Sequence, residues 1–145
     1  NTEHEKFWTF VAEKLKSYAK DEKSAAKTTA KMASFAAGVG TVLFFEDLEV
    51  IQNLQEQFPS YAENFPVWAE HSTAIAQFAT WTALHTLGLG ASLQHYNPIV
   101  DEEVYAEWNV PASWKLRAQL VFGSVEGEAK EKGFVDDAVR FKVFK

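Results

Sequence analysis

The sequence of 145 residues contains no cysteine. This absence excludes a disulfide framework, a thiol nucleophile, and zinc or iron–sulfur sites built on cysteine. It is compatible with a cytoplasmic protein, and we expect a cytoplasmic location. No apolar run reaches the roughly 20 residues that cross a bilayer. The N-terminal residues lack the basic start and apolar stretch of a signal peptide, so we expect no membrane partner.

Basic residues and catalytic motifs are also scarce. The formal charge of −6 argues against nucleic acid as a partner, because phosphate backbones reward clustered lysine and arginine. The four histidines, His4, His71, His85 and His95, form no pair at metal-ligand spacing, so no metal site is predicted. No G-x-S-x-G nucleophile motif is present. We therefore predict no catalytic side chain.

Aromatic residues are the abundant class, at 14% of the chain with 12 Phe and 5 Trp. Rings in this number fill a core, line a flat apolar ligand site, or cover a subunit interface. Composition alone leaves all three open. The length suits one domain, which we expect to span residues 1–145.

Periodicity predicts a chain with both helices and strands. Apolar residues at helical spacing predict helices over residues 3–20, 27–31, 48–58, 66–87 and 101–108. Apolar runs and alternation predict strands over 38–45 and 115–122, and a last strand or extended arm over 139–143. We expect the strand over 38–45 to be buried on both faces. The helix over 66–87 carries a stripe of small and apolar residues, which is typical of a helix central to a fold or to a dimer. The element order indicates an α+β or mixed α/β fold.

The segment 88–98 is expected to be an irregular loop after the long helix. One interpretation is a helix that ends at glycine, followed by a turn. The other is that its glycines bring bare backbone close to a flat ring system, whose edge atoms bond to backbone amides. Gln94 and Asn97 would then supply amide hydrogen bonds, and His95 or Tyr96 a stacking face.

A second candidate site lies near the C-terminus. Alternation would place Arg140 and Lys142 on one face of a terminal strand, where two cations could hold a phosphate. The alternative is a solvated strand edge, where lysine is common.

The stretch Leu87–Pro98 resembles the flavin loop of the FMN-dependent nitroreductase superfamily, in particular its fungal and bacterial nitroreductase-like branch. Further stretches extend the resemblance over nearly the whole chain: Gly40–Asp47, Asp101–Glu103, Trp108–Pro111, Trp114–Lys115, Ala118–Gln119 and Phe122–Gly123.

The resemblance implies a three-layer α+β sandwich, with a mixed sheet, helices on both faces and a long central helix. It implies an intertwined homodimer with FMN at the interface and a C-terminal arm that crosses onto the partner. The implied reaction is ping-pong electron transfer from NAD(P)H, through FMN, to a nitroaromatic or quinone-like acceptor. The amide of His95 would lie near the hydride-accepting ring nitrogen. The implied FMN contacts are Gly90, Leu93, Gln94, His95, Tyr96, Asn97, Arg140 and Lys142.

Members of this superfamily begin with a helix that carries an Arg-Arg-Ser/Thr-type phosphate motif, followed by a strand. Neither is found in this sequence. We therefore expect the chain to represent the larger, C-terminal part of such a domain, with the N-terminal elements missing. The alternative functions are a non-catalytic flavin- or lipid-binding regulatory protein on the same fold, and a helical interaction module without a ligand.

Overall fold

The computed structural model describes residues 2–144, so the expected domain ends, Asn1 and Lys145, lie outside the described residues. Helices and a small sheet together confirm the α+β class. In chain order the elements are α1 (Thr2–Lys16), α2 (Glu22–Ala36), β1 (Gly40–Asp47), α3 (Leu48–Gln57), the 3-10 turn η1 (Pro59–Tyr61), α4 (Asn64–Thr86), β2 (Leu89–Gln94), α5 (Asp101–Trp108), β3 (Trp114–Ser124) and α6 (Asp137–Arg140).

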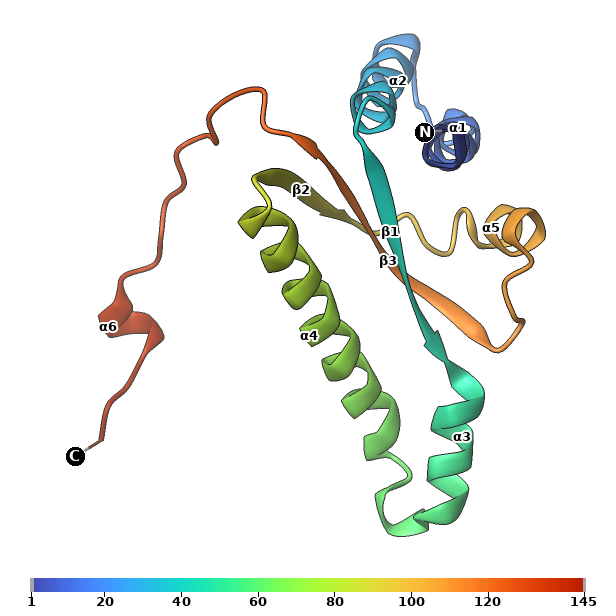
Figure 1. Cartoon of the computed structure of the whole chain (residues 1–145), viewed down its shortest axis with the longest axis vertical. Helices are drawn as coiled ribbons and strands as arrows, with labels where there is room; N and C mark the ends of the chain where they lie inside the picture. The colour runs from blue at the N-terminus through green and yellow to red at the C-terminus, as the bar shows by residue number, and fades with distance from the viewer. Residues whose placement is uncertain (1, 145) are drawn as a thin grey trace.

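The sheet forms the middle layer of three. Its strand order is β1-β3-β2, and the central strand β3 runs antiparallel to both neighbours. The described sheet is therefore antiparallel throughout, where a mixed sheet was expected. The long helix α4 covers one face, while α1, α2 and α5 lie on the other (Figure 1). This arrangement confirms the expected layers, with the long helix on one face of the sheet (Figure 1).

The main core lies between the sheet and the helices α1, α2 and α5. Phe7 and Trp8 pack edge to face, with ring centroids 5.0 Å apart, and both are buried. Aromatic rings contribute the largest share of buried surface per side chain, so this pair anchors α1 to the sheet. The other buried members of this core are Val11, Met32, Val100, Val104, Leu116 and Val121.

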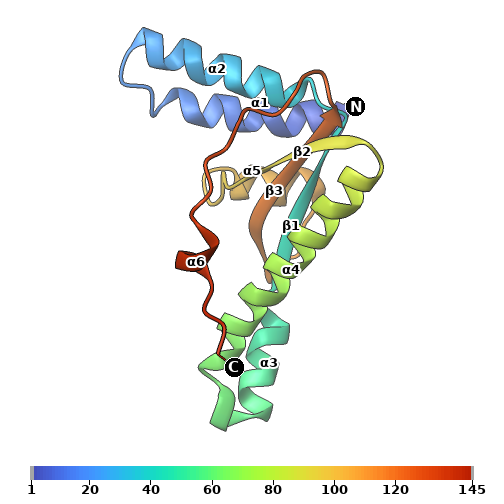
Figure 2. The ribbon, with the colours of Figure 1, turned by 90° about the vertical axis from the view of Figure 1, so that its left-hand side faces the viewer.

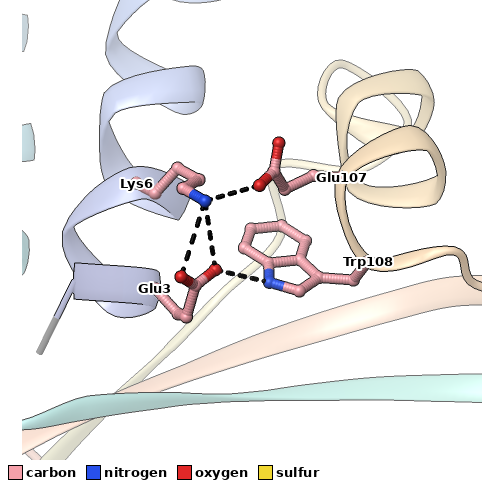
Figure 3. Close-up of polar contacts among 4 residues, drawn as sticks. All are labelled: Glu3, Lys6, Glu107 and Trp108. Atoms are coloured by element: carbon pink, nitrogen blue, oxygen red, sulfur yellow. Dashed lines mark hydrogen bonds and ion pairs between the residues drawn. The ribbon is translucent and has the colours of Figure 1, made fainter.

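Polar contacts also link α1 to α5 (Figure 3). The ammonium of Lys6 pairs with the carboxylates of Glu3 and Glu107. The indole N–H of Trp108 donates to Glu3, at 2.9 Å. The Trp108 hydrogen bond, followed by that from Lys6, lowers the pKa of Glu3. The hydrogen bond to Glu107 raises the pKa of Lys6.

Helix α2 is longer than the expected helix over 27–31. Asp21 caps it by accepting from the Ser24 N–H, and the Ser24 side chain bonds back to the Asp21 backbone. Such a capping box satisfies backbone donors that the first helical turn leaves free. The cap and the good helix formers alanine and lysine extend the helix to 15 residues. In contrast, α1 ends at Lys16, before the expected residue 20.

Strand β1 lies at the edge of the described sheet, and this position corrects one prediction. Only Gly40 and Glu46 are buried along it, and the other residues are half-buried. The apolar run was expected to be buried on both faces, but most of its residues are only half-buried, because an edge strand is covered less completely than the central strand β3. The Asp47 side chain accepts from the Glu49 N–H at 3.0 Å. Asp47 therefore caps α3.

The predicted helix over residues 101–108 is confirmed as α5. Val100 occupies the capping position and Asp101 is the first helical residue, with no side-chain cap bond. One carboxylate oxygen of Asp101 is buried without a hydrogen-bond partner. Burial raises the pKa of this carboxyl.

Helix α4 confirms the expected long helix, but its apolar stripe lies in the open. Ile75, Phe78 and Leu87, at its C-terminal half and end, are 68%, 72% and 74% exposed. Thr73 is its only buried residue. Large apolar side chains left exposed along a helix indicate an interaction surface. Neither α4 nor any other helix within residues 2–144 is long and apolar enough to cross a membrane.

Candidate functional site

The segment 88–98, expected to be an irregular loop, is largely a strand. Strand β2 pairs with β3 from Leu89 opposite Ser124 to Gln94 opposite Gln119. Gly88 has φ of +77°, the left-handed conformation expected of a glycine that ends a helix. The strand depends on its partner, because its glycine, alanine and serine residues have little intrinsic strand preference.

The candidate flavin-contacting residues Leu93–Asn97 lie at the end of β2 and in the turn that follows. Strand β2 is at the edge of the described sheet, opposite β1. His95 is exposed, and the four residues around it are half-buried. Backbone on the outer side of an edge strand can bond to a ligand instead of another strand. This segment is therefore open to a flat ligand.

Side-chain hydrogen bonds order this segment from within. Gln94 donates from Nε2 to the Ser92 hydroxyl, at 2.8 Å. The Tyr96 N–H donates to Oε1 of Gln119, at 2.7 Å, and Nε2 of Gln119 donates to Oδ1 of Asn97, at 3.1 Å. The amide groups of Gln94 and Asn97, expected to serve a ligand, thus also hold the segment in shape.

Sequence reasoning missed Gln119. Alternation along residues 115–122 placed it on the polar face of β3, but its side chain is fully buried. The register shifts between Phe44, opposite Ala118, and Phe45, opposite Leu116, so Arg117 has no partner in β1. Such a bulge breaks simple alternation. The sequence feature that could have indicated its burial is the single neutral amide in the otherwise apolar run Ala118–Phe122.

The ring of Tyr96 already has neighbours in the chain. It packs edge to face with Trp8, at 5.8 Å between centroids, and the Lys31 ammonium lies 5.8 Å from its centroid. His95 and Tyr96, the two candidates for a stacking face, therefore differ in their exposure. His95 is exposed, whereas Tyr96 is half-buried against the core.

Glycines allow close backbone approach beside β2. A Cβ on Gly38 would lie 2.8 Å from the Phe122 carbonyl oxygen, and one on Gly123 would lie 3.3 Å from the Gly38 Cα. A Cβ on Gly90 would lie 3.3 Å from the Val125 side chain. Gly38, Gly90 and Gly123 line one cavity of about 520 Å³, together with Phe35, Ser92 and Phe122.

Arg140 and Lys142 do not lie on one face of a strand. Arg140 is the last residue of α6, where its guanidinium is 3.4 Å from Asp137, and Lys142 donates to the Ala138 carbonyl oxygen at 3.1 Å. Asp136 caps this short helix, which replaces the expected alternation. On both sides of α6 the chain forms an arm without regular structure, which agrees with the predicted alternative of an extended arm.

This arm carries the two cations away from the rest of the candidate site. Residues 127–144 are exposed along their whole length. The arm leaves the end of β3 and descends on the α4 side of the sheet, on the opposite side of the molecule from α5 (Figures 1 and 2). A single chain therefore does not bring Arg140 and Lys142 together with Leu93–Asn97.

A buried charged cluster fastens α4 to the sheet. Glu46 of β1 accepts from the Thr73 hydroxyl at 2.6 Å and from Nε of Arg117 at 2.7 Å. Arg117 also pairs with Glu70, at 2.6 Å. These contacts hold α4 against the sheet. No group of three or more potential metal ligands occurs in the part of the chain that the structure describes.

Comparison with known proteins gives a consistent family. The model of the Nitroreductase family matches residues 1–124. HBN1 of Saccharomyces cerevisiae is 36% identical over 136 residues, which cover 94% of this chain and 66% of HBN1. The nitroreductase FRM2 of the same yeast is 39% identical over 100 residues, 69% of this chain and 51% of FRM2. The chain thus spans half to two thirds of these relatives.

The fold agrees with a solved structure of the same kind. Nitroreductase CinD from Lactococcus lactis, in complex with chloramphenicol, superimposes with a TM-score of 0.87 at 56% identity. The match covers 98% of this chain and 71% of the CinD chain. CinD has also been solved in complex with 4-nitrophenol.

Proposed function

The chain belongs to the nitroreductase family of oxidoreductases, and we propose that it transfers electrons from NAD(P)H to a nitroaromatic or quinone-like acceptor through FMN, by a ping-pong mechanism. The observation that carries this proposal is the open segment Leu93–Asn97 at the edge of the sheet. The nitroaromatic ligands of CinD, chloramphenicol and 4-nitrophenol, support the acceptor class.

The residues of this segment fit the edge of a flavin ring. A ring edge presents nitrogen and oxygen atoms in one plane, and a strand end presents backbone groups in a similar line. The exposed His95 would meet the ring through its amide, while Leu93, Gln94 and Asn97 would border it. Bound FMN would supply the two-electron chemistry, and the chain would orient the ring and limit the access of water.

Arg140 and Lys142 fit a phosphate by charge, but their arm must reach it from another chain. The exposed arm and the exposed apolar face of α4 support a homodimer in which each arm lies across the partner. Two cations beside a phosphate form charge-assisted hydrogen bonds, which are stronger than neutral ones. In this arrangement the two parts of the site come from different protomers.

Steady-state kinetics tests the proposal. The purified chain is supplied with FMN, and the oxidation of NADH or NADPH is followed with 4-nitrophenol as acceptor. We expect oxidation that depends on the protein and gives parallel double-reciprocal lines, the signature of a ping-pong reaction. Free FMN without protein is the control. A chain that binds FMN but oxidises neither nucleotide would instead indicate the flavin-binding regulatory alternative.

A further inference from the structure

The buried side chain of Gln119 contacts the candidate flavin segment on both sides of His95. In the sheet register Gln119 lies opposite Gln94, the residue before His95. Its side-chain oxygen accepts from the N–H of Tyr96, the residue after His95, at 2.7 Å. One residue of the central strand thus fixes both neighbours of His95.

The chemistry of this position requires a neutral amide. The side chain is completely buried, so each of its polar atoms needs a partner within the protein. Oε1 accepts from Tyr96 while Nε2 donates to Asn97, at 3.1 Å. An apolar side chain would supply neither bond, and an ionised glutamate would lack the donor and bury a charge.

We propose that Gln119 is a positioning residue that sets the direction of the His95 backbone amide toward the flavin. This inference rests on the proposed function. Gln119 is on the central strand, held by neighbours on both sides, so it is a rigid reference for the turn that follows β2. The bond to Gln119 occupies the Tyr96 N–H, so it fixes the backbone directly after His95.

The test substitutes Gln119 with methionine, which has a similar length and volume but neither polar group. We expect Gln119→Met to weaken FMN binding at least tenfold and to shift the midpoint potential of the bound flavin. Gln119→Glu keeps an acceptor for the Tyr96 N–H but loses the donor to Asn97 and buries a charge when ionised, so we expect it to recover part of the affinity only at a pH low enough to keep the carboxyl protonated. Thr73→Val is the matched control, because it removes a buried hydrogen bond to Glu46 at the face of α4.

This experiment distinguishes failure of the positioning role from failure of the proposed function. If Gln119→Met binds FMN with unchanged affinity and potential, the positioning role is wrong while the proposed function stands. If the wild-type chain binds no FMN, the proposed function fails, and amide hydrogen exchange decides the positioning role. The proposal then predicts that Tyr96 exchanges faster in Gln119→Met than in Thr73→Val, and equal rates would overturn it.

A variant that does not fold would still leave a decisive measurement. In the wild-type chain the Tyr96 amide is predicted to exchange slowly, because it donates to a buried acceptor, and the amide of the exposed His95 to exchange faster. Equally fast exchange at both positions would overturn the positioning role.

Discussion

Arg117 donates from Nε to a carboxylate oxygen of Glu46 at 2.7 Å, and its Nη2 forms an ion pair with the same oxygen at 2.6 Å. Glu46 is only 6% exposed, and its other oxygen accepts from Thr73 of α4. Arg117 is the residue that the bulge leaves without a partner in β1. The bulge therefore directs a cation to the one buried carboxylate between the sheet and α4.

Replacing Arg117 with methionine is expected to destabilise the fold by about 3 kcal/mol, because it leaves the Glu46 carboxylate buried without its cation. Urea denaturation measures the change. Glu70→Gln is the control, since the Glu70 side chain is half exposed and an exposed pair contributes less than about 1 kcal/mol. Equal losses in the two variants would contradict the structural role of the buried pair.

Acid should loosen the contact between α1 and α5. The Trp108 hydrogen bond lowers the pKa of Glu3 in the folded chain. The stabilisation from a lowered carboxyl pKa is complete above the ordinary value of 4.5 and is lost as the pH falls through the lowered value. The NMR shift of the Trp108 indole N–H is expected to titrate in this acid range. In Glu3→Gln that titration should vanish, and its persistence would contradict the assignment.

The exposed face of α4 is predicted to be the dimer interface. Phe78→Glu should raise the dimer dissociation constant at least about 30-fold, because a charge would be buried at a central apolar contact. Sedimentation analysis measures the constant. Thr29→Glu, on the exposed surface of α2, should leave it unchanged. A wild-type chain that stays monomeric at all concentrations would refute the homodimer.

The cations of the arm are predicted to hold the FMN phosphate. Arg140→Ala combined with Lys142→Ala should weaken FMN binding by about 100-fold or more, since two charge-assisted hydrogen bonds of about 1.5–3 kcal/mol each are lost. Circular dichroism should show little change, because both residues are exposed. Lys130→Ala with Lys132→Ala, on the same arm, is the control. Equal effects of the two double variants would indicate general charge rather than a phosphate site.

Elements whose sequence carries a clear helical or strand periodicity could be predicted from sequence. The helices α3, α4 and α5 and the strand β3 agree with their predicted spans to within a few residues. Strand β2 could not be predicted, because Gly90, Ala91 and Ser92 favour no strand by themselves. Their pairing with β3 depends on residues about 30 positions away. Helix α2 was underestimated because Met32 is its only buried residue, which gives a weak periodic signal.

The candidate site could be predicted only in part, because some of its contacts join residues that are distant in the sequence. The local motif around His95 identified the segment at the edge of the sheet, whereas its support from Gln119 required the tertiary pairing. The bulge at Arg117 reversed the face that alternation assigned to Gln119. Arg140 and Lys142 were expected to share a strand face, but the cap at Asp136 forms a short helix instead.

The central claim is that this chain binds FMN and passes electrons through it. The most direct measurement is the visible absorption spectrum of the purified chain after addition of FMN and removal of unbound flavin, before and after anaerobic addition of NADH or NADPH. The account predicts a retained flavin spectrum that bleaches when the nucleotide is added. A spectrum without flavin, or a retained flavin that neither nucleotide bleaches, would contradict it.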